Sequence, residues 1–146
     1  MIRLLILGKP FGKQRPKFSR RGGFVKTYTP KETISYENYV KTVAISEMED
    51  TGFTGWFEKE PLRVDITAYY EIPNSWSKKK KAQALNNEIM PCVKPDVDNC
   101  VKALFDALNE VLWQDDTQVC ELHISKYYSD RPRIEMEISE WKMKKV

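Results

Sequence analysis

Alternation of apolar and polar residues predicts the strands of this chain. In residues 62–72 every second residue is apolar, and the residues between them are mostly polar. A side-chain period of two places one face of such a strand against a core and the other in solvent. Apolar or alternating runs also predict strands over residues 1–8, 117–128 and 132–139.

Apolar residues that recur every three to four positions predict the helices. One helix is expected over residues 30–48, where the sequence Thr-Pro-Lys-Glu is typical of a helix start. A second is expected over residues 99–112, and a short basic helix from Ser77 to about residue 86. Residues 8–23, rich in glycine, proline and basic side chains, are predicted to form a loop.

These elements predict a single α+β domain over residues 1–146. About four strands are expected to form a mixed sheet, with the helices mainly on one face, in a two-layer sandwich. No internal repeat or linker divides the chain. The pattern leaves the order of the strands open.

Composition excludes several classes of protein. With 41% hydrophobic residues among 146, the chain has enough apolar material for one core, and no apolar run approaches the length of a membrane span. The three cysteines form no CxxC pair, which favours free thiols and a cytoplasmic location. Because His123 is the single histidine, catalysis is expected to rely on carboxylates, lysines and hydroxyl groups.

Charge is segregated along the chain. Residues 1–31 contain nine basic residues and no acidic one, with aromatic residues between them. Residues 96–121 contain seven acidic residues against one base, Lys102. A basic segment suits a phosphate backbone, whereas clustered acids repel DNA unless a cation lies between them. This arrangement favours a metal-dependent enzyme that acts on nucleic acid.

The acidic segment contains a candidate metal site. Asp96 and Asp98 are two residues apart, so in extended backbone both carboxylates point to the same side. Lys102 follows four residues after Asp98, and its ammonium group is expected to project toward the same place. Asp115 and Asp116 lie beyond the predicted helix and join the pair only if the chain folds back. Oxygen ligands of this kind favour Mg²⁺, with Mn²⁺ as the alternative.

Each feature also has a purely structural interpretation. Asp98 or Asn99 is a suitable cap for the helix that follows, and Asp115 with Asp116 is a common turn sequence. The four lysines at residues 78–81 are typical of a solvated helix face. Spacing alone therefore leaves the metal site and the structural cap as open alternatives.

Two motifs resemble the RusA family of Holliday junction resolvases, in its phage and prophage forms. The first is the DxDN of residues 96–99, with a lysine three residues after the asparagine and a D-A-L sequence at residues 106–108. The second is the W-x-D-D-x-Q of residues 113–118. The K-Q-R-P of residues 13–16 and the Y-T-P of residues 28–30 extend the resemblance over most of the chain.

The resemblance implies a Mg²⁺-dependent endodeoxyribonuclease that acts in DNA recombination and repair. As a homodimer, it would introduce paired symmetrical nicks across a four-way DNA junction. Asp96, Asp98 and Asp116 match the family's metal-binding aspartates, and Lys102 matches its essential lysine. Asp115 is a further candidate ligand beside Asp116. No membrane and no nucleotide cofactor are expected as partners.

With this resemblance, the basic N-terminal segment becomes a candidate DNA-binding arm. We expect five of its side chains to contact phosphates: Lys13, Arg15, Lys17, Arg20 and Arg21. Phe18 or Phe24 is a candidate to enter the opened centre of the junction. Two other functions remain, a metal-dependent DNA nuclease with less selectivity for structure and a junction-binding protein without catalysis.

Overall fold

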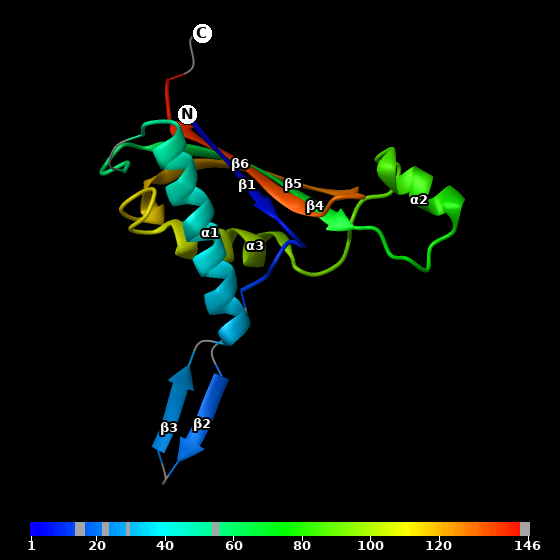
Figure 1. Ribbon diagram of the computed structural model, residues 1–146, viewed down its shortest axis with the longest axis horizontal. Coiled ribbons are helices and arrows are strands. Elements are labelled where there is room, and N and C mark those ends of the chain that lie inside the picture. Colours follow the sequence, from blue (N-terminus) through cyan, green and yellow to red (C-terminus); the bar gives the residue numbers. More distant parts are fainter. Residues whose placement is uncertain (14–16, 22–23, 29, 54–55, 144–146) are drawn as a thin grey trace.

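A four-stranded mixed sheet forms one layer of the protein (Figure 1). The computed structural model describes residues 1–13, 17–21, 24–28, 30–53 and 56–143. The strands lie in the order β1 (Ile2–Leu7), β6 (Arg133–Glu140), β4 (Leu62–Glu71) and β5 (Val119–Ser129). β4 and β5 are parallel, whereas β1 and β4 each pair antiparallel with β6. The predicted α+β class and mixed sheet are confirmed.

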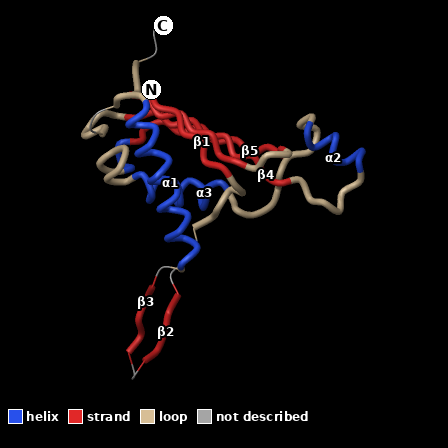
Figure 2. Tube along the Cα trace, viewed as in Figure 1, coloured by secondary structure: helices blue, strands red, loops and turns tan. Residues whose placement is uncertain are grey.

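Helices cover one face of the sheet. α1 (Lys31–Asp50) packs against β1 and against α3 (Val97–Leu108), and both helices lie on the same side of the strands (Figure 2). Every second residue of β4 is buried beneath them, as its alternating sequence predicts. Trp113, Leu104 and Leu108 are among the largest fully buried side chains of this core. The sheet and α3 therefore share one hydrophobic interior.

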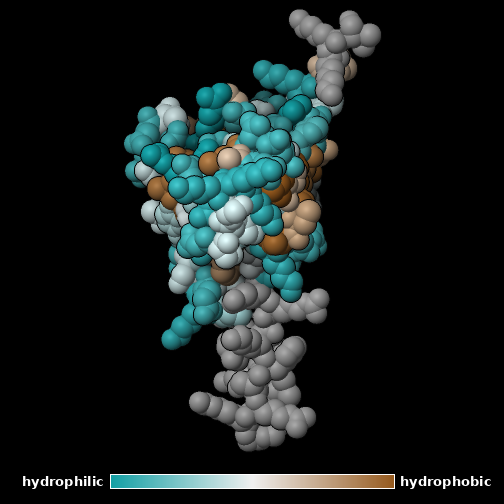
Figure 3. Space-filling view, turned by 90° about the vertical axis from the view of Figure 1, so that its right-hand side faces the viewer, coloured by the Kyte–Doolittle hydropathy of each residue, from teal (hydrophilic) through white to brown (hydrophobic). Residues whose placement is uncertain are grey.

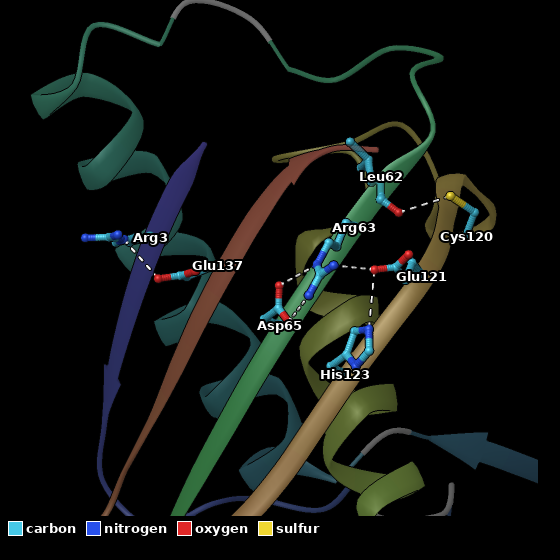
Figure 4. A network of polar contacts seen from close by, with 8 residues as sticks. All are labelled: Arg3, Leu62, Arg63, Asp65, Cys120, Glu121, His123 and Glu137. Atoms are coloured by element: carbon cyan, nitrogen blue, oxygen red, sulfur yellow. Dashed lines mark hydrogen bonds and ion pairs between the residues drawn. The ribbon is translucent and has the colours of Figure 1, made fainter. Parts of the chain in front are cut away.

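The opposite face of the sheet carries several charged side chains, together with the exposed Leu5 and Leu7 of β1. Arg63 on β4 lies between two carboxylates, with its Nε 3.0 Å from Asp65 Oδ2 and its Nη1 2.6 Å from Glu121 Oε2 (Figure 4). Arg3 Nε lies 3.1 Å from Glu137 Oε1 across the β1–β6 pair. Charged side chains are seldom fully buried in proteins. This face of the two-layer sandwich is therefore the one in contact with solvent.

α2 (Lys78–Leu85) stands apart at one end of the molecule (Figure 1). As predicted, Ser77 caps it, and the hydroxyl oxygen accepts a hydrogen bond from Lys80 N at 3.2 Å. Ala84 is its one buried residue, and the view from this side shows a mainly hydrophilic surface (Figure 3). No helix in the described ranges is long and apolar enough to cross a membrane.

Two predicted elements differ from the structure. The predicted loop over residues 8–23 contains β2 (Lys17–Arg21), which pairs antiparallel with β3 (Phe24–Tyr28) in a separate hairpin. These strands lack an alternating apolar pattern because the hairpin extends away from the core (Figure 1). The second predicted helix, residues 99–112, is α3, which begins at Val97 and ends at Leu108. The chain then turns at Glu110, whose φ is 62°.

Candidate active site

A groove forms where two distant segments of the chain meet. The Lys13 amide donates to the Asn99 carbonyl at 3.4 Å, which joins the segment after β1 to the start of α3. Gly12 makes this approach possible, because a Cβ there would lie 2.7 Å from Pro95 Cβ. The groove has a volume of about 780 Å³ and is lined by Pro10, Phe11, Gly12, Lys13, Lys94, Pro95, Asp96 and Asn99.

Asp96 and Asp98 lie beside this groove at the N-terminal end of α3. Asp96 occupies the cap position with extended backbone, and Asp98 lies in the first helical turn. Asp98 is therefore helical, and the prediction of extended backbone through both aspartates is wrong. The helix begins early because its unpaired N–H groups and dipole favour negative charge at this end.

Both carboxylates are available for a ligand. Asp96 and Asp98 are exposed, and neither makes a hydrogen bond or ion pair with another residue in the part of the chain where side chains are described. Asp96 occupies the N-cap position of α3, but its side chain accepts no hydrogen bond from the first turn of the helix. The structural interpretation that Asp98 or Asn99 caps the helix is wrong, because Asp96 occupies the cap position.

Lys102 lies one helical turn after Asp98, on the same side of α3. Its Nζ is 3.7 Å from Asp106 Oδ2, and 63% of its side chain is exposed. This contact is loose, and it leaves the ammonium group accessible to a phosphate. Asp96 and Asp98 thus lie at the start of α3, and Lys102 follows in the middle of the helix with its ammonium group toward Asp106.

Lys13, predicted to contact DNA, is already paired with carboxylates of the protein. Its ammonium group binds Asp106 on α3 and lies 3.5 Å from Glu37 Oε1 on α1. Burial opposes the charged form of Lys13, but its bond to Asp106 and the charges of Asp106 and Glu37 outweigh that cost and raise its pKa. Lys13 therefore links the two helices beside the groove.

The side chains of the other four predicted phosphate contacts lie outside the described residues. Lys17, Arg20 and Arg21 belong to β2, whose backbone is described, and Arg15 lies outside the described residues. The hairpin extends beyond the N-terminal end of α1, away from the sheet (Figure 1). Phe18 and Phe24 lie on the same hairpin, and their predicted role in opening a junction stays a prediction.

The W-x-D-D-x-Q motif forms a compact turn at the other end of α3. Trp113 is fully buried, and its Nε1 donates to Asn109 Oδ1 at 2.7 Å. Asp115 caps a short 3₁₀ helix, η1 (Asp116–Gln118), in a reciprocal bond with Gln118. Hydrogen bonding from Thr117 lowers the pKa of Asp115. Asp115 thus has the structural role that its turn sequence allows.

Asp116 is oriented by this turn, yet it lies far from the first two aspartates. Val119, at the start of β5, pairs with Leu62 at the start of β4, whereas Asp96 lies beside Tyr70 near the end of β4. The stretch of strand from Leu62 to Tyr70 spans about 26 Å. The chain does fold back, but Asp116 precedes the returning strand, so one subunit does not bring it to the pair.

The metal-ligand chemistry at the groove rests on two carboxylates. Within residues 1–13, 30–53 and 56–143, no three His, Cys, Asp or Glu side chains are grouped closely enough to hold a metal ion. Mg²⁺ is nevertheless commonly held by one or two carboxylates, with water and substrate phosphate oxygens in the other positions. Asp96 and Asp98 are therefore a suitable donor set for a hard divalent cation at this site.

Two residues that bind the loop before α3 belong to no sequence motif, and they were not predicted from the sequence. Tyr70 Oη donates to the Pro95 carbonyl at 2.5 Å, and Lys126 Nζ donates to the Val93 carbonyl at 2.8 Å. One feature of the sequence could have identified Lys126. Lys126 is paired with buried Ala68 in the parallel register and so occupies a helix-facing position of β5, which is unusual for lysine.

Comparison with known proteins agrees with this arrangement. Residues 8–139 match the family model described as endodeoxyribonuclease RusA. The chain is also 39% identical over 141 residues to the uncharacterized protein YqaN of Bacillus subtilis strain 168, a match that covers 95% of this chain and 96% of YqaN. The matched family region includes the groove, α3 and the W-x-D-D-x-Q turn. The chain therefore belongs to the RusA family of endodeoxyribonucleases, the Holliday junction resolvases.

Proposed function

We propose that this resolvase is a homodimer that uses Mg²⁺, or Mn²⁺ in its place, to cut four-way DNA junctions by paired symmetrical nicks. The observation that carries this proposal is the exposed carboxylate pair of Asp96 and Asp98 beside the groove, with Lys102 one turn away. The proposed role is recombination and repair of DNA in the cytoplasm. A prophage origin remains part of the same proposal.

The proposed chemistry divides between the cation and the side chains. A divalent cation supplies water activation and charge stabilisation in phosphodiester hydrolysis. Asp96 and Asp98 would hold it through oxygen atoms, the donors that hard cations prefer. The accessible ammonium group of Lys102 would stabilise negative charge on the phosphate undergoing attack.

Asp116 enters this proposal from a second subunit. In one chain it lies at the end of the sheet opposite to Asp96, as judged from the register of β4 and β5. Two copies related by a two-fold axis and packed antiparallel along this edge would bring each Asp116 toward the partner's carboxylate pair. In the described part of the chain β5 is an edge strand, and Val97 and Leu122 are exposed apolar side chains on α3 and β5.

The basic hairpin is proposed to bind the DNA arms. Residues 1–31 contain no acid, so the hairpin concentrates positive charge beyond the N-terminal end of α1 (Figure 1). Arg15, Lys17, Arg20 and Arg21 remain its proposed phosphate contacts. Lys13 is retained as a proposed contact only if DNA displaces its two carboxylate partners.

The test compares the wild type with Asp98→Asn on a synthetic four-way junction and on a matched linear duplex. Asp50→Asn is the control, since Asp50 is an exposed aspartate at the far end of α1. We expect paired nicks in the junction by the wild type and the control, with Mg²⁺ and not with EDTA. Asp98→Asn should bind the junction without cutting it.

Other results would favour the two alternatives. Equal cutting of duplex and junction would indicate a nuclease with little selectivity for structure. Junction binding without cleavage by the wild type in Mg²⁺ and in Mn²⁺ would contradict the proposed metal chemistry. Normal cutting by Asp98→Asn would remove Asp98 from the site.

A further inference from the structure

The segment that carries Asp96 is held from the sheet side by two side chains on neighbouring strands. Tyr70, near the end of β4, is 3% exposed and donates its phenol hydrogen bond to the Pro95 carbonyl at 2.5 Å. Lys126, on β5, donates to the Val93 carbonyl at 2.8 Å. Two carbonyl groups of one short loop are therefore fixed immediately before Asp96.

The bond to Pro95 acts on the peptide group that leads into Asp96. The Pro95 carbonyl and the Asp96 amide belong to the same planar unit, so a hydrogen bond to the carbonyl orients both. The Asp96 carbonyl in turn accepts the Cys100 amide at 3.1 Å in the first turn of α3. The backbone of Asp96 is thus fixed on both sides, which limits the directions its carboxylate can take.

Gly12 closes the opposite side of the same loop. A Cβ at Gly12 would lie 2.7 Å from Pro95 Cβ, so the backbone of the segment after β1 lies directly against Pro95. Pro95 is therefore held between Gly12 and the Tyr70 phenol. The loop is therefore contacted from both sides at Pro95.

Packing alone does not account for a lysine at position 126. The ammonium group lies 4.6 Å from the centre of the Tyr70 ring, and the residue shares the helix-facing side of the sheet with buried Ala68. Methionine would cover the ring equally well but would offer no donor to a carbonyl group. Among the described side chains, the cation donates its hydrogen bond to Val93 and stacks on Tyr70, so its distinctive contribution is to this loop.

Tyr70 also contacts the first turn of α3. Cys100 Sγ is buried and lies 3.5 Å from Tyr70 Oη. The phenol group that bonds to Pro95 therefore also packs against the helix turn that follows Asp96.

We propose that Tyr70 and Lys126 are positioning residues for Asp96, acting through the carbonyl groups of Pro95 and Val93 to present its carboxylate to a divalent cation. This inference rests on the proposed metal-dependent function and adds two residues that no motif identifies. Neither residue is assigned a contact with DNA. Their effect is on metal affinity and on the order of the Asp96 backbone.

The variants are Tyr70→Phe, which removes one oxygen atom, and Lys126→Met, which removes the charge and keeps the length. Tyr127→Phe is the control for the phenol, since Tyr127 lies on β5 and stacks with Tyr69 on the open face. Lys80→Met is the control for the lysine, since Lys80 also stacks on an aromatic ring, Trp76, away from the groove. Lys126→Arg keeps a positively charged donor, so this variant should retain most of the metal affinity of the wild type.

The first readout is the Mn²⁺ concentration that gives half-maximal junction cleavage, with the junction Kd measured without metal. Loss of a residue that orients a metal ligand typically lowers metal affinity or activity about 10- to 100-fold. We expect Tyr70→Phe and Lys126→Met to raise the half-maximal concentration about tenfold or more and to leave the Kd unchanged. The two control variants should match the wild type.

The second readout needs no cleavage and no metal. The order parameter of the Asp96 amide, from ¹⁵N relaxation, should fall from about 0.85, typical of rigid backbone, toward about 0.6 in Tyr70→Phe. An inactive wild type would contradict the proposed function, and this order parameter would still decide the positioning role. Unchanged order in both variants, or a weaker Kd with an unchanged Mn²⁺ requirement, would overturn the inference.

Discussion

Replacement of Lys13 by methionine tests whether this residue links two helices or contacts DNA. Its ammonium group binds Asp106 and lies 3.5 Å from Glu37 Oε1, and the three side chains are 25%, 23% and 18% exposed. At an effective dielectric constant near 20, unit charges at that separation attract by about 5 kcal/mol before desolvation and entropy are counted. Lys13→Met removes this attraction, takes away the described cationic partner of Glu37 and leaves Asp106 with only the loose contact to Lys102.

The net cost lies between two known limits. Exposed pairs contribute about 0–1 kcal/mol, and the loss of one partner from a buried pair costs about 3–5 kcal/mol. Because these side chains are about one-fifth to one-quarter exposed, we expect Lys13→Met to lower the free energy of unfolding by about 2 kcal/mol. The raised pKa of Lys13 means that this contribution is fully present below its ordinary value of 10.5 and is lost as the pH rises past the raised value.

Urea unfolding at neutral pH measures this change. The variants are Lys13→Met, Asp106→Asn and the double replacement, with an expected coupling energy of about 1–2 kcal/mol. Lys9→Met is the matched control, because the Lys9–Glu71 pair is 2.7 Å long but 71% and 49% exposed. We expect the control to cost less than about 0.5 kcal/mol.

A different outcome would refute the structural role. If Lys13→Met is no more costly than Lys9→Met, and no coupling to Asp106 is measured, the link does not stabilise the fold. If the same variant also lowers the salt slope of junction binding by about 1, Lys13 is a phosphate contact, as the sequence predicts.

Three further predictions concern the groove, the turn and the hairpin. Gly12→Ala should impair cleavage and lower stability, because the new methyl group would lie 2.7 Å from a proline Cβ; thermal unfolding and cleavage rates measure both effects. Gln118→Ala should lower the free energy of unfolding by about 2 kcal/mol in urea, since its amide bonds to two carbonyls and two N–H groups. Joint replacement of Lys17, Arg20 and Arg21 by alanine should reduce the salt slope of junction binding by about 2.7 if each neutralises one phosphate, and an unchanged slope would contradict their DNA role.

Secondary structure could be predicted from the sequence wherever one face of an element is buried. β4 alternates through its whole length because its two faces meet a core and solvent, and its predicted range is nearly that observed. The β2–β3 hairpin was missed for the same reason, since it contributes no alternating face to the core. β4 and β5 pair in parallel because the chain returns through α3 before β5 begins. Strand direction therefore depends on tertiary structure and could not be predicted from the local sequence pattern.

The candidate site divides in a similar way. Asp96, Asp98 and Lys102 are close in sequence on one short segment, so their place on one helix and its cap could be predicted. The partners of Lys13 lie 24 and 93 residues away in the chain, and the bond from Tyr70 to Pro95 spans 25 residues. These contacts depend on tertiary structure, and local spacing therefore could not reveal them.

The proposed two-subunit site is tested most directly by mixing two inactive variants. Asp98→Asn and Asp116→Asn subunits carry different tags and are co-purified through both, so that each dimer contains one of each. If Asp116 serves the partner's carboxylate pair, the mixed dimer has one complete site and one site with both defects. We expect that neither variant alone cuts a four-way junction with Mg²⁺, whereas the mixed dimer makes single nicks. No nicking by the mixed dimer, with a wild type that cuts normally, would contradict it.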